Sequence, residues 1–338
     1  RILSKVFIGE YVMKNVLILN AGTRNKLISY FLEECKGKCE VIVTDNFYLA
    51  PTLYIADKYY ITKQYKEAGY IDEIINICVE NNVGLVVSLI DPELTLLSEN
   101  KARFDEINVL LNTSSPKVIE VSFDKYKTYE FLKDNGFNYI KTYKDLNECL
   151  EAISCGKIQF PLFAKPINGS GSACIQKLDN TEQLKNYWAK YDNLIIQEFM
   201  NGYEIGVDVY IDLISGEPIN MFFKRKIKMR AGETDKSVSF KNEKLKTDII
   251  EFVKKFGLKG ANDIDVFERD GEFYISEINP RFGGGYLHAY ECGVNFPKYL
   301  LNNMNGEKNN PDFDAYEENV YMMKYFDVKM IKMESVDE

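Results

Sequence analysis

Lys165 and the loop after it have the composition of a phosphate-binding site. Lys165 ends an apolar run and is followed by residues 168–172, which are rich in glycine and serine. Glycines let backbone N–H groups turn toward one point, and a fixed lysine supplies the cation that phosphate requires. A solvent-exposed turn has the same composition, so this segment alone does not decide the function.

Asp265, Glu277 and Asn279 are candidate metal ligands on either side of the hairpin signal at residues 269–271. Folding the strands back brings Asp265 near Glu277, and Asn279 shares the face of Glu277 because side chains alternate along a strand. Two carboxylates and an amide suit Mg²⁺, which substrate phosphates usually complete. Asp263 shares this face and competes with Asp265 for the role, and a surface hairpin with acids facing water is the other interpretation.

A basic run at residues 224–230 places five cations among seven residues of an acidic chain. Its alternate members, ending at Arg230, would share one face of a strand. Such a face suits a polyphosphate or a carboxylate, but lysines also protect exposed edge strands. The single histidine, His288, disfavours histidine-rich metal sites and a Ser-His-Asp hydrolase, and we expect it to be structural.

The first half of the chain alternates between strand and helix patterns. Residues 15–20 and 40–44 are apolar runs that flank a helical pattern near residues 27–32, and the alternation continues to about residue 113. This order predicts a doubly wound parallel sheet covered by helices on both faces. The first turn, residues 21–27, lacks the G-x-G-x-x-G spacing, which disfavours an NAD-linked dehydrogenase.

The pattern changes after the turn signal at residues 114–116. Two predicted helices, residues 124–135 and 146–153, come before a strand at residues 158–164, whose internal proline indicates an edge or a bulge. Further predicted strands follow at residues 194–199, 204–211, 219–223, 263–267 and 272–278. Antiparallel pairing is expected to dominate this half.

Composition and charge exclude several classes of protein. Hydrophobic residues make up 46% and charged residues 28%, and 42 bases against 51 acids give a net charge of −9, which argues against a nucleic-acid partner. No apolar run approaches the ~20 residues of a membrane helix, so we expect no membrane partner. Seven scattered cysteines predict free thiols in the cytoplasm. Residues 1–12 are expected to be an irregular extension, because Met13-Lys14 is typical of a natural start.

Five motifs, in the correct order, resemble the ATP-grasp superfamily, closest to its carbamoyl-phosphate-synthetase-like and amino-acid-ligase branches. They are Lys125 in FDKYKTYEFLKDNGF, Lys165 in FAKP, the NGSGS loop, QEFMNGYE at 197–204, and SEINPRFGGG at 276–285. The resemblance covers nearly the whole chain. It implies an α/β pre-ATP-grasp domain at 1–115, followed by a two-lobed α+β ATP-grasp domain with a small subdomain at 116–200 and a large one at 201–338.

The resemblance also implies a role for individual residues. The cations and mobile loop that hold the ATP phosphates would be Lys125, Lys165, Gly169, Ser170, Gly171 and Ser172. The adenine segment would be Gln197, Glu198, Phe199 and Met200, and Glu204 would accept hydrogen bonds from the ribose. The ligands of Mg²⁺, with Mn²⁺ as an alternative, would be Asp265, Glu277 and Asn279, although many relatives carry Gln or Glu at the position of Asp265. Arg281 would face the transferred phosphoryl group, and Arg230 is a looser match to a phosphate or substrate contact.

The implied activity is that of an ADP-forming carboxylate–amine ligase. A small carboxylate, an amino acid or related metabolite, would attack the γ-phosphate of ATP, and an amine would displace phosphate from the acyl phosphate. A kinase of bicarbonate or carbamate and an ATP-binding module without turnover are the alternatives. Analogy with the family allows a homodimer.

Overall fold

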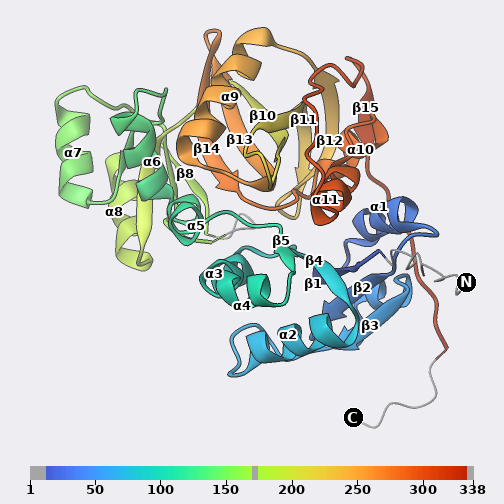
Figure 1. Cartoon of the computed structure of the whole chain (residues 1–338). Coiled ribbons are helices and arrows are strands. Elements are labelled where there is room, and N and C mark those ends of the chain that lie inside the picture. The colour runs from blue at the N-terminus through green and yellow to red at the C-terminus, as the bar shows by residue number, and fades with distance from the viewer. Residues whose placement is uncertain (1–12, 170–173, 333–338) are drawn as a thin grey trace, which may run out of the picture.

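The computed structural model describes residues 13–169 and 174–332, so the predicted extension at 1–12 and the loop residues Ser170, Gly171 and Ser172 lie outside the described residues. Within them the chain forms three sheets (Figure 1). A parallel sheet lies below the large antiparallel sheet in this view, and a small antiparallel sheet with its helices forms a lobe at the left. The predicted fold class is confirmed.

The N-terminal sheet is parallel, in the order β3-β2-β1-β4-β5. Its strands are β1 (Asn15–Leu19), β2 (Val41–Asp45), β3 (Lys58–Ile61), β4 (Val83–Ser88) and β5 (Leu110–Leu111). Its helices are α1 (Asn25–Cys35), the 3₁₀ helix η1 (Pro51–Tyr54), α2 (Tyr70–Glu80), α3 (Asp91–Glu99) and α4 (Lys101–Glu106). The strand order reverses between β1 and β4, and in such sheets the crevice at the carboxyl ends of these strands is where ligands bind.

The small lobe contains an antiparallel sheet in the order β6-β9-β7-β8. Its strands are β6 (Thr142–Tyr143), β7 (Leu162–Pro166), β8 (Gln176–Leu178) and β9 (Leu194–Glu198), and its helices are α7 (Leu146–Ser154) and α8 (Thr181–Lys190). Helices α5 (Pro116–Phe123) and α6 (Lys125–Asp134) lead into it. The strand predicted at 158–164 begins only at Leu162, so Pro161 precedes it, and the edge prediction was wrong because β7 lies between two strands.

The large lobe contains an antiparallel sheet in the order β14-β13-β10-β11-β12-β15. Its strands are β10 (Tyr203–Ile211), β11 (Pro218–Arg230), β12 (Glu233–Phe240), β13 (Gly260–Arg269), β14 (Glu272–Asn279) and β15 (Tyr321–Met323). Its helices are α9 (Glu243–Phe256), α10 (Tyr286–Glu291) and α11 (Phe296–Met304). The basic run belongs to β11, which pairs with β10 and β12, so it is not an exposed edge strand.

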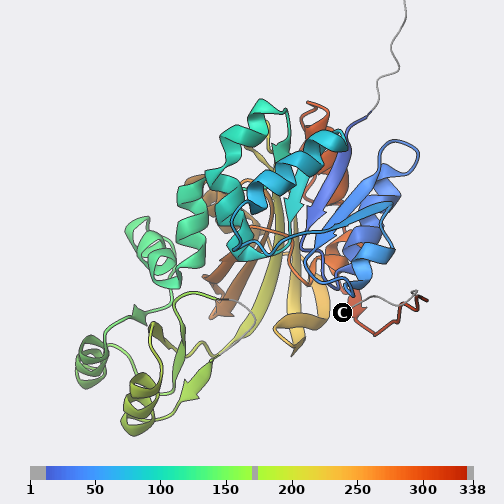
Figure 2. The ribbon, with the colours of Figure 1, turned by 90° about the horizontal axis from the view of Figure 1, so that it is seen from below.

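The two faces of this large sheet differ in character. Val207, Val209 and Ile264 point toward α9 and pack against Phe252 in a hydrophobic core. Because side chains alternate along each strand, the intervening residues of β10, β11 and β13 point to the opposite face. Polar side chains therefore collect on the face opposite α9. In the view from below, the parallel domain lies in front of the large sheet, and the small lobe extends to the lower left (Figure 2).

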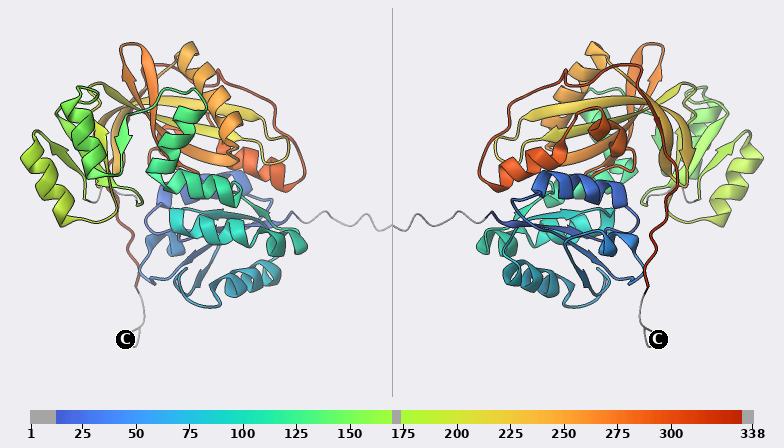
Figure 3. Two further views of the ribbon diagram at one scale, coloured as in Figure 1. Left: turned by 90° about the vertical axis from the view of Figure 1, so that its left-hand side faces the viewer. Right: turned by 90° about the vertical axis from the view of Figure 1, so that its right-hand side faces the viewer.

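A second hydrophobic core joins the N-terminal domain to the large lobe. Val16, Ile18 and Phe31 of the first domain pack in one cluster with Phe282 and Phe296. The side views show α10 and α11 lying against the parallel domain (Figure 3). Within the described residues, no helix is long and apolar enough to cross a membrane.

We expect Phe282→Ala to lower the free energy of unfolding by about 3–5 kcal/mol, because it leaves a cavity in this shared core. The Phe282 ring is 2% exposed and lies 4.9–6.2 Å, between ring centroids, from Tyr286, Phe31 and Phe296. Urea denaturation measures the change. The control Phe326→Ala, at a ring that is 74% exposed, should change stability by about 0.5 kcal/mol or less. Equal effects would contradict the shared core.

Candidate active site between the lobes

The β13–β14 hairpin places the acidic candidates opposite each other. Asp265 pairs with Glu277 and Asp263 pairs with Asn279 in the antiparallel register, so all four side chains lie on the same face. The turn that fixes this register has positive φ at Asp270 and at the following glycine, as the predicted hairpin requires. Asp263 and Asp265 both face the site, so the alternation of side chains along β13 does not decide which of them is the metal ligand.

Lys226 links the acidic cluster to the predicted ribose-binding acid. Its Nζ lies 2.5 Å from the Asp265 carboxylate and 2.8 Å from that of Glu204, and its side chain is 5% exposed. Burial alone would lower the pKa of Lys226, but the Asp265 and Glu204 carboxylates outweigh this effect and raise it. The pKa of Asp265 is raised by burial and by Asp263, Glu204 and Glu277, against the opposing effect of Lys226. The acids outnumber the lysine, so an added cation would be stabilised here.

The donor set at this hairpin fits a magnesium ion. Two carboxylates and one amide oxygen are hard ligands, and Mg²⁺ usually takes few protein ligands together with substrate phosphates. Among the described residues, no three acidic, histidine or cysteine side chains form a group that could hold a metal ion by themselves. The residues that would hold the ion are Asp265, Glu277 and Asn279.

Lys165 stands on the facing wall, in the sheet of the small lobe. Leu162 and Ala164 of β7 point into the lobe's own core, so Phe163 and Lys165 point the other way. Among the described residues, Lys165 is 8% exposed and has no ion-pair partner. Burial lowers its pKa to about 8, with Lys125 acting in the same direction and Glu277 opposing. Lys125 donates from Nζ to the carbonyl of Gly169 at 2.8 Å, which ties the first residues of the predicted lid to α6.

This lowered pKa predicts that nucleotide affinity falls at alkaline pH. Bound phosphate favours the charged amine, so the pKa of Lys165 should be higher in the complex than its value of about 8 in the free protein. Affinity for Mg·ATP should therefore be constant below about pH 7 and fall above about pH 8, approaching tenfold per pH unit. Calorimetric titrations across this range measure how the affinity for Mg·ATP depends on pH. The variant Lys165→Arg should show little change of affinity with pH. A flat curve for the parent protein would contradict the assignment.

The segment predicted to hold adenine forms the link between the two lobes. Glu198 donates from its N–H to the Lys141 carbonyl at 3.0 Å, and its carboxylate accepts from the Lys141 N–H and contacts Arg269 at 3.3 Å. Gln197 donates to Thr142 at 2.8 Å, so its amide holds β6 against β9. Phe199 lies near Phe163, with their ring centroids 6.5 Å apart, and Met200 is buried beside Arg269.

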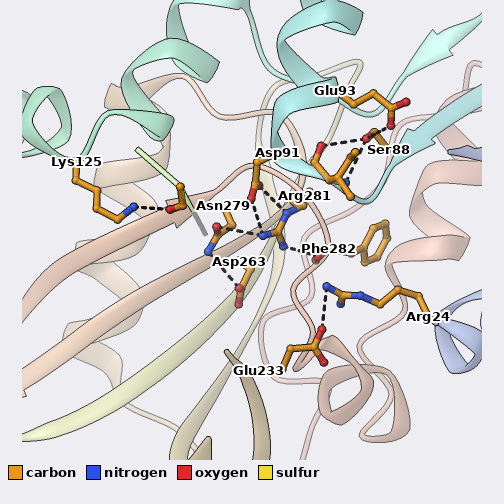
Figure 4. A network of polar contacts seen from close by, with 12 residues as sticks. Arg24, Ser88, Asp91, Glu93, Lys125, Glu233, Asp263, Asn279, Arg281 and Phe282 are labelled. Atoms are coloured by element: carbon orange, nitrogen blue, oxygen red, sulfur yellow. Dashed lines mark hydrogen bonds and ion pairs between the residues drawn. The ribbon is translucent and has the colours of Figure 1, made fainter. Parts of the chain in front are cut away.

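Arg281 follows β14 and is held by residues from two domains (Figure 4). Its guanidinium contacts Asp91, with Nε 2.6 Å from Oδ1 and Nη2 donating to Oδ2 at 3.0 Å. It also donates to Asn279 at 3.3 Å and to the Phe282 carbonyl at 3.0 Å. The pKa of Arg281 is raised by Asp91 and the other acids despite burial, so the cation persists.

The first turn of the parallel domain also reaches this region. Arg24 pairs with Glu233 of β12 at 3.1 Å. The glycine-rich segment after Arg281 packs closely against two acidic side chains, Asp263 and Glu233. A Cβ at Gly283 would be 2.4 Å from Asp263, and one at Gly284 would be 2.5 Å from Glu233. Sequence reasoning missed Arg24, Asp91 and Glu233. The signal that could have found two of them is that Arg24 and Asp91 follow β1 and β4, the strands beside the switch point.

Two other candidates lie apart from this cluster. Arg230, at the exposed end of β11, stacks its guanidinium 4.1 Å above the Phe326 ring and forms no ion pair among the described residues. His288 is buried, and its two ring nitrogens contact Ser237 at 2.8 Å and the Val320 carbonyl at 3.1 Å. Burial lowers its pKa to about 4, so the ring is neutral and structural as expected.

A cavity of about 750 Å³ lies between the parallel domain and the grasp lobes. One end is formed by Lys125, Glu277 and Asn279, and Asp91 lies on the wall. Apolar and aromatic side chains form much of the remaining wall: Tyr65, Tyr70, Ile71, Leu96 and Phe123. Three of the candidate phosphate and metal residues, Lys125, Glu277 and Asn279, therefore border a space large enough for a small organic substrate.

The part of the chain that forms much of the two lobes matches a known family. The family model described as the ATP-grasp domain matches residues 122–285. The chain contains an ATP-grasp domain. The part before the ATP-grasp domain, residues 16–111, matches the model described as the PylC-like N-terminal domain. The family predicted from the five motifs is confirmed, and the chain is an ATP-dependent ligase.

Curated and solved ATP-grasp proteins are similar to this chain over different spans. A carbamoyl-phosphate synthase of Methanobrevibacter smithii is 26% identical over 81% of this chain and 76% of its own length. A D-alanine–D-alanine ligase of Fervidobacterium nodosum is 25% identical over 53% of this chain and 66% of its own. The biotin carboxylase domain of the Hydrogenobacter thermophilus 2-oxoglutarate carboxylase, solved as a dimer with MgADP and bicarbonate, has a TM-score of 0.74 at 16% identity, covering 91% of this chain and 73% of that one.

Proposed function

We propose that the chain is a Mg²⁺- and ATP-dependent ligase that activates a small carboxylate and joins it to an amine. ATP would lie between the lobes, with adenine at Glu198–Met200, the ribose at Glu204, and the phosphates between Lys165 and the acidic hairpin. Magnesium, held by Asp265, Glu277 and Asn279, would neutralise phosphate charge and orient the triphosphate. Supporting this site, Asp265 and Glu277 pair across the hairpin, and both carboxylates act on the buried Lys165, where they oppose the lowering of its pKa by burial.

The reaction would proceed in two steps. A carboxylate oxygen forms a bond to the γ-phosphorus while the bond from that phosphorus to the bridging oxygen of ADP breaks. An amine then attacks the carbonyl carbon of the acyl phosphate, phosphate leaves, and the ammonium proton passes to solvent. Lys125, Lys165 and Arg281 supply fixed positive charge where negative charge shifts, and Arg281 is positioned for this by Asp91 and Asn279. Arg230 would contact substrate only if the β11 end approached the site.

The size and the lining of the cavity beside Glu277 and Asn279 support one class of substrate over the other. Its volume of about 750 Å³ equals roughly 25 water molecules at about 30 Å³ each. Bicarbonate and carbamate have four heavy atoms and would leave most of this space, and its aromatic wall, without contacts. The cavity therefore favours a carboxylate with an organic body over the bicarbonate kinase.

Phosphate release tests this proposal. The protein with Mg·ATP should release phosphate only when a carboxylate and an amine are both supplied, and bicarbonate with ammonia should be a poor pair. Release with bicarbonate alone would favour the kinase. Binding of ATP without release for any pair in a panel of amino acids and other small carboxylates would favour the module without turnover.

We further propose the chain's domain limits, setting and assembly. The three predicted parts, 1–115, 116–200 and 201–338, follow the three sheets. All seven cysteines are free thiols, which supports the cytoplasm. The dimeric state of the Hydrogenobacter thermophilus biotin carboxylase domain supports a homodimer, acting on small-molecule substrates, and sedimentation would test it.

A further inference from the structure

An apolar and largely aromatic surface lies at one edge of the parallel domain. The Tyr54 ring of η1 lies 5.6 Å, between ring centroids, from that of Tyr59 on β3, and its hydroxyl donates to the Tyr48 carbonyl at 2.5 Å. These contacts join exposed and half-buried side chains into one surface, the β3 surface: Phe47, Tyr48, Leu49, Tyr54, Tyr59 and Ile61. Soluble proteins rarely expose a contiguous apolar surface unless a partner binds there.

The strand within this surface has an unpaired edge. In the part of the chain that the structure describes, β3 is the last strand of the parallel sheet and pairs with β2 alone. The Thr62 N–H, directly after β3, donates to the Asp45 carbonyl of β2 at 3.0 Å. Because backbone groups point alternately to the two sides of a strand, those of Tyr59 and Ile61 point away from β2. Such an edge is a template for a further strand.

We propose that a second copy of the chain binds this edge, with β3 antiparallel to β3, so that the sheets of two parallel domains become continuous. In an antiparallel pair, residues whose backbone groups point outward exchange hydrogen bonds. The register that places Tyr59 opposite Ile61 of the partner subunit meets this condition at both positions. It also forms two symmetric pairs of an aromatic and a β-branched side chain, a favourable cross-strand combination.

Charge complementarity supports this register and a second copy as the partner. Asp57 and Lys63 flank β3, and both are exposed. With Tyr59 opposite Ile61, each Asp57 lies opposite Lys63 of the partner subunit, so unlike charges meet at both ends of the paired strands. Shifting the register by two residues loses this match, because Asp57 then faces Ile61, or Lys63 faces Tyr59. The edge is therefore complementary to itself, as a two-fold dimer requires.

Sedimentation equilibrium of the full chain over a concentration series tests the association independently of any enzymatic activity. We expect a monomer–dimer equilibrium in which Ile61→Lys raises the dissociation constant at least about 100-fold, because it removes a buried apolar side chain at two symmetric positions. The matched control is Ile214→Lys in the turn between β10 and β11, where the isoleucine is 40% exposed against 48% for Ile61, and it should dimerise as the parent does. A monomeric parent, or equal dimerisation of Ile61→Lys and the parent, would overturn the proposal.

Cross-linking tests the register. In a background that carries Cys155→Ser and Cys174→Ser, which remove the two exposed thiols, the variants Tyr59→Cys and Ile61→Cys are oxidised separately and as a mixture. In the proposed register, positions 59 and 61 of the two copies lie about 5.5 Å apart between Cα atoms, which a disulfide can span. Each position lies about 7–8 Å from its own copy on the diagonal, which is too far. The mixture should therefore give at least about fivefold more linked dimer than either variant alone. Equal yields, or no linked dimer in the mixture, would overturn the proposal.

Discussion

Replacing Glu277 with glutamine is expected to reduce phosphate release by about 10²–10³-fold, a typical cost of removing one charge-stabilising group from an active site. The substitution keeps the shape of the side chain and removes one of the two carboxylates that β13 and β14 place opposite each other. The remaining Asp265 is already shared with Lys226 at 2.5 Å. Steady-state phosphate release, measured across a Mg²⁺ titration, should show both a lower rate and a higher metal requirement.

The same hairpin offers a matched control for this substitution. Glu272 begins β14 at the far end of the hairpin and pairs with Lys244 at 2.9 Å on the surface. Glu272→Gln should leave phosphate release within about twofold of the parent, because exposed ion pairs contribute little. An unchanged Mg²⁺ requirement in Glu277→Gln would remove Glu277 from the metal site.

Replacing Lys165 with methionine is expected to weaken Mg·ATP binding by at least about 100-fold. Removing one member of a buried, charge-paired contact costs about 3–5 kcal/mol, and the phosphate would lose its buried partner here. Calorimetry with a non-hydrolysable ATP analogue measures the loss. Lys185→Met, at an exposed lysine of α8 in the same lobe, should bind as the parent does.

Stability measurements distinguish this loss of binding from loss of folding. In the free protein, burial penalises the charge of Lys165, as the lowered pKa of about 8 shows. A methionine of similar length removes that penalty, so Lys165→Met should unfold at an equal or higher urea concentration. Parental affinity in this variant would remove Lys165 from the nucleotide site.

Local patterns predicted much of the fold. Continuous apolar runs separated by helical spacing indicated the parallel sheet, because strands buried on both faces leave no alternation. The turn at residues 269–271 fixed the register of its hairpin, so Asp265 and Glu277 were paired correctly from spacing alone. Their proposed roles came from the family resemblance, since a surface hairpin has the same pattern.

Interactions between distant segments were beyond this reasoning. The neighbour of Arg281 is Asp91, 190 positions away, and that of Glu233 is Arg24. The periodicity of residues within one segment gives no information about which distant side chain will form an ion pair with it.

Of the two interpretations of the basic run, the exposed edge strand was wrong for a related reason, since the partners of β11 depend on the order of the whole sheet. Lys224 proved to be fully buried against Asp208, and Lys226 lies among the acids of the hairpin. Arg230, at the end of the same run, is exposed to solvent. One run of cations therefore occupies both the interior and the surface, which its composition alone does not indicate.

The aromatic cluster around Phe282 determines how the chain can be divided. Phe31 and Val16, before the predicted limit at residue 115, share that cluster with Phe296 and Leu300, far beyond it. A truncated fragment beginning at residue 116 would carry half of an apolar core with water in place of the missing half. Such a fragment should aggregate when expressed alone, and co-expression with the excised first part should restore it. The first domain and the large lobe are therefore expected to fold together rather than as separate units.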